Sequence, residues 1–487
     1  MAYEHGISVL ENPTPTRIPV ITNSGIQVVI GTAPVNQAQN VEDAVNKPII
    51  CYSWEDAVSK LGYSDDWDKY TLCQAMDASF KRLNVAPVVF INVLNPSTHK
   101  ASITDEKVTI LNKSVVLKIE GVILNDTFKV KNATEATTYI KDTDYNVAFN
   151  ELGQPVVSII ESGTIPSDAI ELKLDYEKLD PSTVTEANII GGIDGETNEY
   201  SGIEVISLIY PMLGLVPGML LAPGWSHKPN IAAVLDAKCR KINGSFNCIN
   251  ILDIDSNTIA KYQDVSVWKK ANNYTSKYSI VLWPKVKIGL KTYYYSAIIA
   301  ALMAHVDAEN DNVPHKSPSN KKLPIIATVA NNKEVFLDQL QGNFLNSIGV
   351  ITAINMNGWR TWGNNTAAYP DCTDPKDRFI SIRRIFDWWG NTFINKFYDK
   401  VDEPTNYRLI ESILDDENIR ANGLQAKGQI AGAKMEFRQQ DNSTEDILNG
   451  RIQFVQKISA YPPAESIVNI LEFDPSYISK EIFGGDQ

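Results

Sequence analysis

The stretch GIQVVIGTAP, Gly25–Pro34, decides the fold class. It is a short apolar run, rich in β-branched residues and ended by glycine and proline, which is typical of a strand buried on both faces. SWEDAVSKLG follows, with Ser53 as a helix N-cap and a final glycine. A second apolar run, APVVFINVLNP at Ala86–Pro96, comes after a further helical pattern. Strand, helix and strand in this order predict an α/β domain.

The composition changes at about residue 98 and changes back at about residue 189. This stretch has no Trp, Cys or Arg, and it has 9 Lys against 15 Asp plus Glu. Short alternating runs such as SVVLKIEGV and AIELKLDY are separated by turn residues, which is typical of a small β-sandwich or barrel. Because the α/β pattern returns afterwards in GIEVISLIYPMLGL, we predict an inserted all-β domain with an acidic, solvent-facing surface.

The C-terminal part mixes helices and strands. A long amphipathic helix is predicted at about residues 378–398 and another at about 407–422, followed by strands in GAKMEFRQQ, GRIQFVQKIS and ESIVNILEF. The predicted fold is therefore a multidomain α/β and α+β protein. Its predicted parts are an N-terminal arm (1–20), an α/β core (21–97 and 190–356), the inserted β domain (98–189), a C-terminal α+β domain (357–463) and a C-terminal strand arm (464–487).

Charge and cysteine content exclude several classes of protein. The chain of 487 residues has a net charge of −13, which argues against nucleic-acid binding over a broad surface. Its five cysteines form no C-x-x-C pair, so neither a disulfide framework nor a zinc cluster is expected. The sequence shows no apolar run long enough to span a membrane and no signal-peptide pattern. We expect synthesis in a bacterial cytoplasm and no direct membrane insertion.

Few polar motifs suggest catalysis. Ser226 and His227 are adjacent after a strand, but Lys228 breaks the G-x-S-x-G pattern of a nucleophile elbow. Asp253 and Asp255 form a D-x-D that could hold a divalent cation, with no glycine-rich phosphate loop beside it. We expect a structural turn, no metal, no cofactor and no enzymatic activity. The alternative is a soluble α/β hydrolase or metal-dependent enzyme that uses these residues.

The remaining histidines fit no metal-binding motif. His305 stands in a helical pattern without the H-E-x-x-H of zinc proteases, and His315 lies in a polar loop. We expect both to be structural or solvated.

The helix pattern RRIFDWWGNTFINKFYDK has an aromatic face and a basic side. The aromatic and aliphatic residues Ile385, Trp388, Trp389, Phe393 and Phe397 fall largely on one face. One interpretation is a core-facing helix with a solvated basic side, and the other is a basic side that docks on an acidic partner. The candidate contact residues are Arg383, Arg384, Lys396 and Lys400.

Several motifs together resemble the tail sheath proteins of contractile phage tails and phage-tail-like bacteriocins. They are YEHGISVLENPTPTRIPV with VVIGTAP, LAPGWSHKPNIAAVL, INMNGWRTWGNNTA, DRFISIRRIFDWW, GQIAGAKMEF and GRIQFVQKISAYPPAESIVNILEF. Their order covers nearly all of the chain outside the insertion.

The resemblance implies a structural subunit that forms hexameric rings stacked around a tail tube. Contraction would drive the tube through a target cell envelope, and baseplate and tail terminator proteins would be further partners. The resemblance also implies that both terminal arms add strands to neighbouring subunits, which would satisfy their unpaired backbone groups. The predicted arm residues are Gly6, Ile7, Ser8, Val9 and Leu10, and Ile467, Val468, Asn469, Ile470, Leu471, Glu472 and Phe473.

The insertion could also bind carbohydrate. Glycan sites usually use aromatic platforms, and the aromatic residues available here are Phe128, Tyr139, Tyr145, Phe149 and Tyr176. We treat this as an addition to the structural role, since a β fold alone implies no function.

Overall fold

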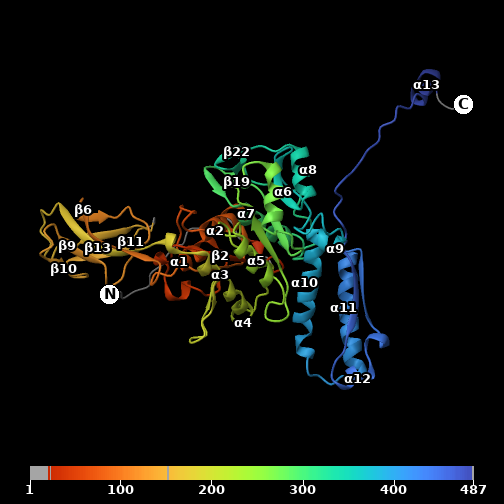
Figure 1. The fold of residues 1–487 in the computed structure, drawn as a ribbon, viewed down its shortest axis with the longest axis horizontal. Coiled ribbons are helices and arrows are strands. Elements are labelled where there is room, and N and C mark those ends of the chain that lie inside the picture. Colours follow the sequence, from red (N-terminus) through yellow and green to blue (C-terminus); the bar gives the residue numbers. More distant parts are fainter. Residues whose placement is uncertain (1–19, 22, 151–152, 485–487) are drawn as a thin grey trace, which may run out of the picture.

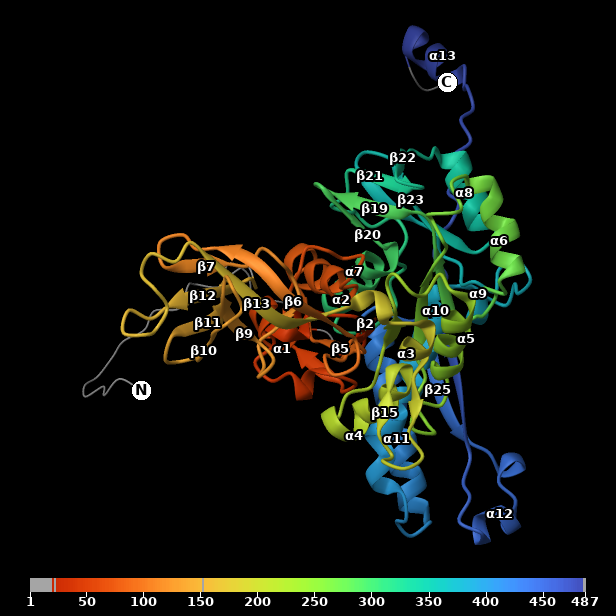
Figure 2. The same cartoon turned by 60° about the vertical axis from the view of Figure 1, so that its left-hand side comes forward.

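The computed structural model describes residues 20–21, 23–150 and 153–484. A mixed α/β centre carries an elongated β region on one side and a helical region on the other (Figure 1). The C-terminal segment runs away from the body (Figures 1 and 2). The mixed α/β class predicted from the sequence is confirmed.

A mostly parallel sheet forms the centre, in the order β24-β23-β18-β17-β16-β2-β5-β3. Its two edge strands, β24 and β3, are antiparallel to their neighbours. All five residues of β2 are buried, as expected for a parallel strand covered on both faces. The strands are β2 (Gln27–Gly31), β3 (Ile49–Cys51), β5 (Val88–Asn92), β16 (Met219–Leu221), β17 (Ile249–Asp253), β18 (Ser279–Leu282), β23 (Val350–Asn355) and β24 (Trp359–Trp362).

Helices cover both faces of this sheet. On β17, Asn250 donates to Asp236 of α5, whereas Asp253 accepts from Ser296 of α7. Side chains of opposite parity point to opposite faces of a strand, so α5 and α7 lie on opposite sides. The helices are α1 (Trp54–Leu61), α2 (Leu72–Met76), α3 (Glu186–Ile190), α4 (Ile209–Leu213), α5 (Pro229–Lys238), α6 (Val265–Ala271), α7 (Tyr295–Ala308) and α8 (Gln339–Ser347).

Smaller sheets surround the centre. β1 (Val20–Ile21) pairs with β4 (Val85–Ala86), and β14 (Gly192–Ile193) pairs with β15 (Tyr200–Ser201). A four-stranded sheet in the order β20-β19-β21-β22 lies near α8. Its strands are β19 (Lys285–Ile288), β20 (Lys291–Tyr293), β21 (Ala327–Ala330) and β22 (Lys333–Val335).

The β region between residues 100 and 179 has a core of its own. One sheet has the order β10-β9-β13-β6 with β8 also on β13, and the other has the order β11-β12-β7. Buried side chains such as Val130, Val157 and Leu174 form a separate apolar cluster there. The strands are β6 (Lys100–Thr109), β7 (Ser114–Val116), β8 (Val122–Ile123), β9 (Lys129–Asn132), β10 (Thr138–Tyr139), β11 (Tyr145–Phe149), β12 (Pro155–Ile159) and β13 (Glu171–Leu179).

The C-terminal region pairs two long helices with a β-hairpin. α10 and α11 run side by side away from the centre (Figures 1 and 2). The elements are α9 (Pro375–Arg378), α10 (Ile380–Phe397), α11 (Tyr407–Ala426), β25 (Gly432–Phe437), α12 (Thr444–Leu448), β26 (Phe454–Ser459) and α13 (Ser476–Phe483). None of the helices in the described part of the chain has the length and apolar character that crossing a membrane requires.

A buried lysine ties α6 to the turn between α8 and β23 and to the chain between β24 and α9. Lys269 is 4% exposed, and its Nζ donates to the carbonyl oxygens of Ile348 (2.7 Å), Ala367 (2.7 Å) and Tyr369 (3.3 Å). One ammonium therefore satisfies three backbone acceptors that the surrounding chain leaves unpaired.

Replacing this lysine should destabilise the core. Lys269→Met keeps the apolar stem but leaves three buried carbonyl oxygens without a donor, so we expect a loss of about 3 kcal/mol in the free energy of unfolding. Thermal and urea unfolding measure the change. Lys270→Met, at the exposed neighbouring position, is the matched control and should stay within about 0.5 kcal/mol of the parent. Equal stability of the two variants would show that the Lys269 contacts contribute nothing.

Candidate assembly interface

Two apolar clusters hold the C-terminal helices and hairpin together. One contains Trp389, Ala421 and Ile430, and the other contains Phe397, Ile413 and Met435. In each cluster the residues come from α10, from α11, and from β25 or the residues just before it. The hairpin is therefore fixed on the helix pair by buried side chains.

The hairpin has one open edge, at β26. β25 and β26 are joined by six antiparallel residue pairs, from Gly432 with Ser459 to Phe437 with Phe454, and no other strand in the described part of the chain pairs with either. On the outer side of β25, the Met435 N–H donates to Asn418 Oδ1 of α11 (2.9 Å), and the Met435 carbonyl accepts from Asn418 Nδ2 (3.3 Å). An open edge presents unpaired backbone N–H and C=O groups to any strand that approaches it, so the hairpin can accept a further strand beside β26.

The helix pair offers more apolar surface than the hairpin covers. Trp388 and Phe393 of α10 and Leu409 and Leu414 of α11 pack against the two clusters but are only half-buried. The hairpin's outer face is charged, since Glu436 forms ion pairs with Lys434 (3.3 Å) and Lys457 (3.5 Å). A strand added at the edge of the hairpin would therefore contact apolar side chains of the helix pair with one of its faces. Its other face would lie on the charged side of the hairpin.

The C-terminal arm is an exposed apolar segment. Ile467 is 89% exposed and Leu471 is 87% exposed, and Val468, Ile470 and Phe473 are also exposed. The arm runs away from the body as an extended chain (Figure 1). It ends in α13, whose apolar side chains Tyr477, Ile478, Ile482 and Phe483 are likewise exposed.

The predicted strand at Glu465–Phe473 is not formed within the single chain. The segment has no assigned strand and no ladder partner among the described residues. A strand exists only through hydrogen bonds to a neighbouring strand, and the arm lies away from the other strands of its own chain. The N-terminal arm residues Gly6, Ile7, Ser8, Val9 and Leu10 lie outside the described residues.

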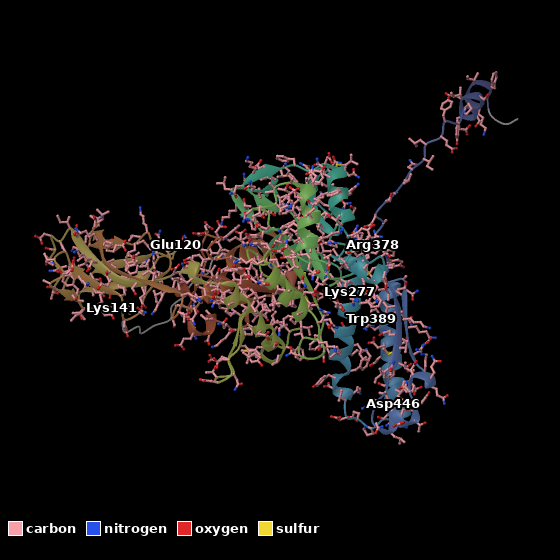
Figure 3. The ribbon with its side chains drawn as sticks, in the orientation of Figure 1. Glu120, Lys141, Lys277, Arg378, Trp389 and Asp446 are labelled. Atoms are coloured by element: carbon pink, nitrogen blue, oxygen red, sulfur yellow. The ribbon has the colours of Figure 1, made fainter. Side chains whose placement is uncertain are left out.

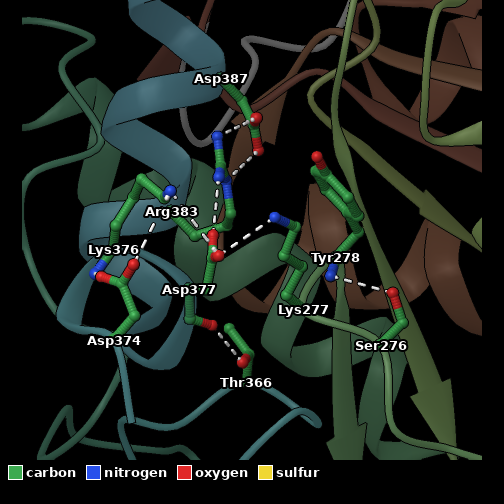
Figure 4. Close-up of polar contacts among 9 residues, drawn as sticks. All are labelled: Ser276, Lys277, Tyr278, Thr366, Asp374, Lys376, Asp377, Arg383 and Asp387. Atoms are coloured by element: carbon green, nitrogen blue, oxygen red, sulfur yellow. Dashed lines mark hydrogen bonds and ion pairs between the residues drawn. The ribbon is translucent and has the colours of Figure 1, made fainter. Parts of the chain in front are cut away.

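Buried ion pairs join α10 to the α/β centre. Arg383 donates to Asp387 (2.8 Å) and Asp377 (3.0 Å), and Lys277 reaches Asp377 from the segment before β18 (3.0 Å; Figure 4). Burial raises the pKa of Asp387 to about 6, although Arg383 beside it opposes the rise. The network fixes the start of α10 against the sheet.

A second buried pair lies one residue further along α10. Arg384 and Asp307, the latter near the end of α7, are 5% and 1% exposed, and they form a two-pronged pair with one N–O distance of 3.0 Å. Ser24 also donates to Asp307 (3.2 Å). Removing one partner of such a pair leaves an uncompensated buried charge, so the contact between α10 and α7 depends on both residues.

These contacts correct the predicted basic surface. Arg383 and Arg384 cannot act as free surface cations, because both are buried and already paired within the chain. Lys396 is exposed and lies 3.8 Å from Asp416. Lys400 is exposed just beyond α10. Of the four predicted contact residues, Lys396 and Lys400 are therefore the accessible ones, and Lys396 already has an acidic neighbour within the chain.

The candidate hydrolase residues form a structural contact. Ser226 is fully buried, and its hydroxyl bonds to Asp253 rather than to His227. Asp253 also accepts two hydrogen bonds from Ser296. The His227 ring stacks on Tyr294, with ring centroids 6.0 Å apart. The expected structural turn is confirmed at residues 223–227, and in place of the Ser–His pair of the alternative hypothesis the structure has a buried Ser–Asp–Ser contact between sheet and helix.

The candidate metal pair is also used within the chain. Asp255 accepts from the backbone of Asn257 (3.0 Å) and from Thr258 (2.8 Å), which closes a turn after β17. Burial raises the pKa of Asp253 to about 6. Within the described residues, no cluster of three or more His, Cys, Asp or Glu could hold a metal ion.

The usual ligand position of an α/β sheet is filled by protein. Ligands bind beyond the carboxyl ends of the strands, where the strand order reverses, which here is between β2 and β16. Thr71 lies against both strand ends. A Cβ added at Gly31 would clash with Thr71 Oγ1, and one added at Gly224 would lie 2.9 Å from Thr71 Cγ2. The crevice is closed by this side chain.

The two other histidines lie within the chain's own contacts. His305 on α7 is 3.3 Å from Glu309, and burial lowers the pKa of His315, which is half-buried in its loop.

The aromatic residues of the inserted region are core residues. Phe128, Tyr139, Tyr145 and Tyr176 are each less than 8% exposed and belong to the apolar cluster of that region. The expectation that they form a carbohydrate-binding platform is therefore wrong for these four. Phe149, in β11, is partly exposed.

Comparison of the sequence with curated proteins finds relatives of one kind. The chain is 27% identical over 489 residues to the tail sheath protein of Burkholderia phage BcepMu, covering 98% of each chain. It is 27% identical over 322 residues to the tail sheath protein of Escherichia phage P2, covering 64% of this chain and 74% of that one. No family model matches the chain.

Solved structures show the same fold. A chain of the anti-feeding prophage baseplate has a TM-score of 0.59 and 14% identity, and covers 97% of this chain and 100% of its own. A chain of the sheath complex of an extracellular contractile injection system, in its contracted state, has a TM-score of 0.55 and 15% identity, covering 98% and 99%. The chain is therefore similar in sequence to tail sheath proteins over almost its whole length, and it shares its fold with chains of the anti-feeding prophage and of an extracellular contractile injection system.

Proposed function

We propose that the chain polymerises as stacked hexameric rings around a tail tube and that contraction of this sheath drives the tube through a target cell envelope. The observation that carries the proposal is the C-terminal arm, an apolar segment exposed along its whole length. Contiguous apolar surface of this kind marks a site of protein association. The mechanism is mechanical and needs no catalytic group.

The arm is proposed to add a strand to the hairpin of a neighbouring copy. Side chains of alternate residues point to opposite faces of a strand, so Ile467, Leu471 and Phe473 share one face with Asn469. Burying three such side chains contributes about 5 to 8 kcal/mol, and main-chain hydrogen bonds to the open edge of β26 add to this. Gly6–Leu10 at the N-terminus are proposed to act in the same way.

The parts of the chain take different positions in this proposal. Residues 357–463 face the tail tube, residues 21–97 and 190–356 form the ring body, and residues 98–189 face outward. Arms 1–20 and 464–487 link neighbouring copies. Baseplate and tail terminator proteins are the further partners, and the subunit is made in a bacterial cytoplasm before it joins a phage tail or phage-tail-like particle.

Contraction in this proposal is a switch between two packings of the same subunits. Neighbouring copies change their contacts while the arms keep them linked, and many copies each releasing about a few kcal/mol make the switch irreversible. The buried pair Arg384–Asp307, and the contacts of Asp377 with Arg383 and Lys277, support this view, because they make α10 move with the α/β centre as one body.

Substitutions on the two faces of the arm should have unequal effects. Replacing Ile467 and Leu471 with Ser removes two side chains from the face proposed to be buried, so we expect sheath assembly to fall by tenfold or more. Val468→Ser with Ile470→Ser is the matched control on the opposite face and should reduce assembly less. Electron microscopy of purified protein, counting cylinders or rings per unit mass, measures both.

Equal loss of assembly in both pairs would argue against a one-faced strand. Unchanged assembly of the Ile467 and Leu471 variant, with cylinders as abundant as in the parent, would contradict strand addition by this arm.

A substitution at Lys400, the exposed lysine beyond α10, tests whether this end of the helix contacts the tail tube. Lys400→Glu reverses a charge at the proposed tube contact, and we expect co-sedimentation of sheath with the tail tube to fall several-fold while self-assembly is unchanged. Lys316→Glu, in a loop of the α/β centre, is the control. Unaltered co-sedimentation of the Lys400 variant would exclude this residue as a tube contact, and Lys396 would be tested next.

A further inference from the structure

The start of the C-terminal arm is pinned to the α/β centre. β26 ends at Ser459, and the chain then crosses through Pro462 and Pro463 to the region of α9. There the Glu465 carboxylate accepts from Arg378 Nη2 (2.6 Å) and lies 3.4 Å from Asn364 Nδ2. The prolines thus lie in a strap that is fixed at both ends. The freely extended part begins only after Glu465.

The arginine that holds the arm is itself held in place. Arg378 Nε donates to Asn365 (2.9 Å), and the guanidinium carbon lies 4.4 Å from the ring centroid of Tyr369 and 4.5 Å from that of Phe379. Figure 3 labels Arg378 at the point where the arm leaves the body. Two rings and a side-chain amide orient the cation before Glu465 arrives, so little order has to be gained when the pair forms.

The pinning contact is polar and accessible to water. The side chains of Arg378 and Glu465 are 23% and 35% exposed. A cavity of about 410 Å³ lies between the strap and the body, lined by polar residues such as Ser317, Asn346 and Asn365 together with Pro463. A part-exposed ion pair over a polar cavity is weakened by salt and holds far less strongly than an apolar interface. The contact is therefore suited to opening and closing.

We propose that the Glu465–Arg378 pair is a releasable latch that gives the C-terminal arm two lengths. With the latch closed, the arm reaches from Ser466. With the latch open, residues 460–465 join the free segment and extend the reach by up to about 20 Å. The proposal rests on the proposed sheath function, in which neighbouring copies change their separation while the arm stays inserted.

The latch assigns separate roles to two parts of one segment. Residues 467–473 make the link to the next copy. Residues 460–465 are additional chain length that becomes available to the arm when the Glu465–Arg378 pair opens. A sheath subunit needs this additional length when neighbouring copies move apart, because the inserted strand itself cannot lengthen without losing its hydrogen bonds.

Distances measured in the full chain test the latch. Nitroxide labels at Gln339→Cys on α8 and Val468→Cys on the arm, in a Cys372→Ser background, report the reach of the arm by pulsed electron paramagnetic resonance. The other four cysteines are buried. The charge-reversing variant Glu465→Lys breaks the pair, and Glu472→Lys, further along the exposed arm, is the matched control.

The closed latch predicts a narrow distance distribution in the parent and in Glu472→Lys at low salt. Glu465→Lys should give a distribution at least twice as broad, and raising the salt concentration should move the parent toward it. An equally broad distribution in the parent and in Glu465→Lys would overturn the latch.

Failure of the latch is distinguishable from failure of the sheath proposal. The distance distribution is measured at protein concentrations at which electron microscopy shows no rings or cylinders, so it does not depend on strand exchange, whereas the arm-face variants above report on assembly. Unfolding of Glu465→Lys is checked by its melting temperature, and Glu465→Gln, which removes the charge at constant size, should show the same broadening. A narrow distribution in Glu465→Gln that is also insensitive to salt would contradict the proposal.

Discussion

An unpaired strand edge is the constraint on which this structure depends. The hairpin β25–β26 lies on α10 and α11 with the β26 edge open, and the same chain carries an apolar segment, residues 467–473, that has no ladder partner among the described residues. Pairing of open backbone groups and burial of apolar side chains both lower the free energy. We propose that the arm of one copy and the hairpin of the next satisfy each other in this way, which links the copies into a polymer.

Buried ion pairs impose the second constraint, because they fix α10 to the α/β centre. Arg384 reaches Asp307 of α7, and Arg383 reaches Asp377 and Asp387, all with little exposure. These pairs are costly to break because each leaves a charge without its partner. The helix pair that bears the hairpin is therefore rigidly coupled to the sheet, while the arm beyond Glu465 is held by a single accessible pair. Buried ion pairs thus hold the body together as one unit, whereas a weaker, accessible ion pair holds the arm.

Local patterns in the sequence predict much of the fold, and long-range pairing limits the rest. The buried run at Gln27–Gly31 and the cap at Ser53 are visible in the sequence because burial on both faces and helix capping leave marks within a few residues. The burial of Arg384 was missed because Asp307 lies 77 residues away, although Asp387, four residues after Arg383, was a local sign of pairing. The strand at residues 467–473 was predicted from composition, but residues 20–21, 23–150 and 153–484 supply no strand that pairs with it.

The most direct test of the central claim is an electron cryomicroscopy map of the assembled sheath, read at residues 467–473. The account predicts that these residues lie as a strand against β26 of an adjoining copy, with Ile467 and Leu471 facing the helix pair. A map in which this segment packs on its own body, or runs outside every hairpin, would contradict it.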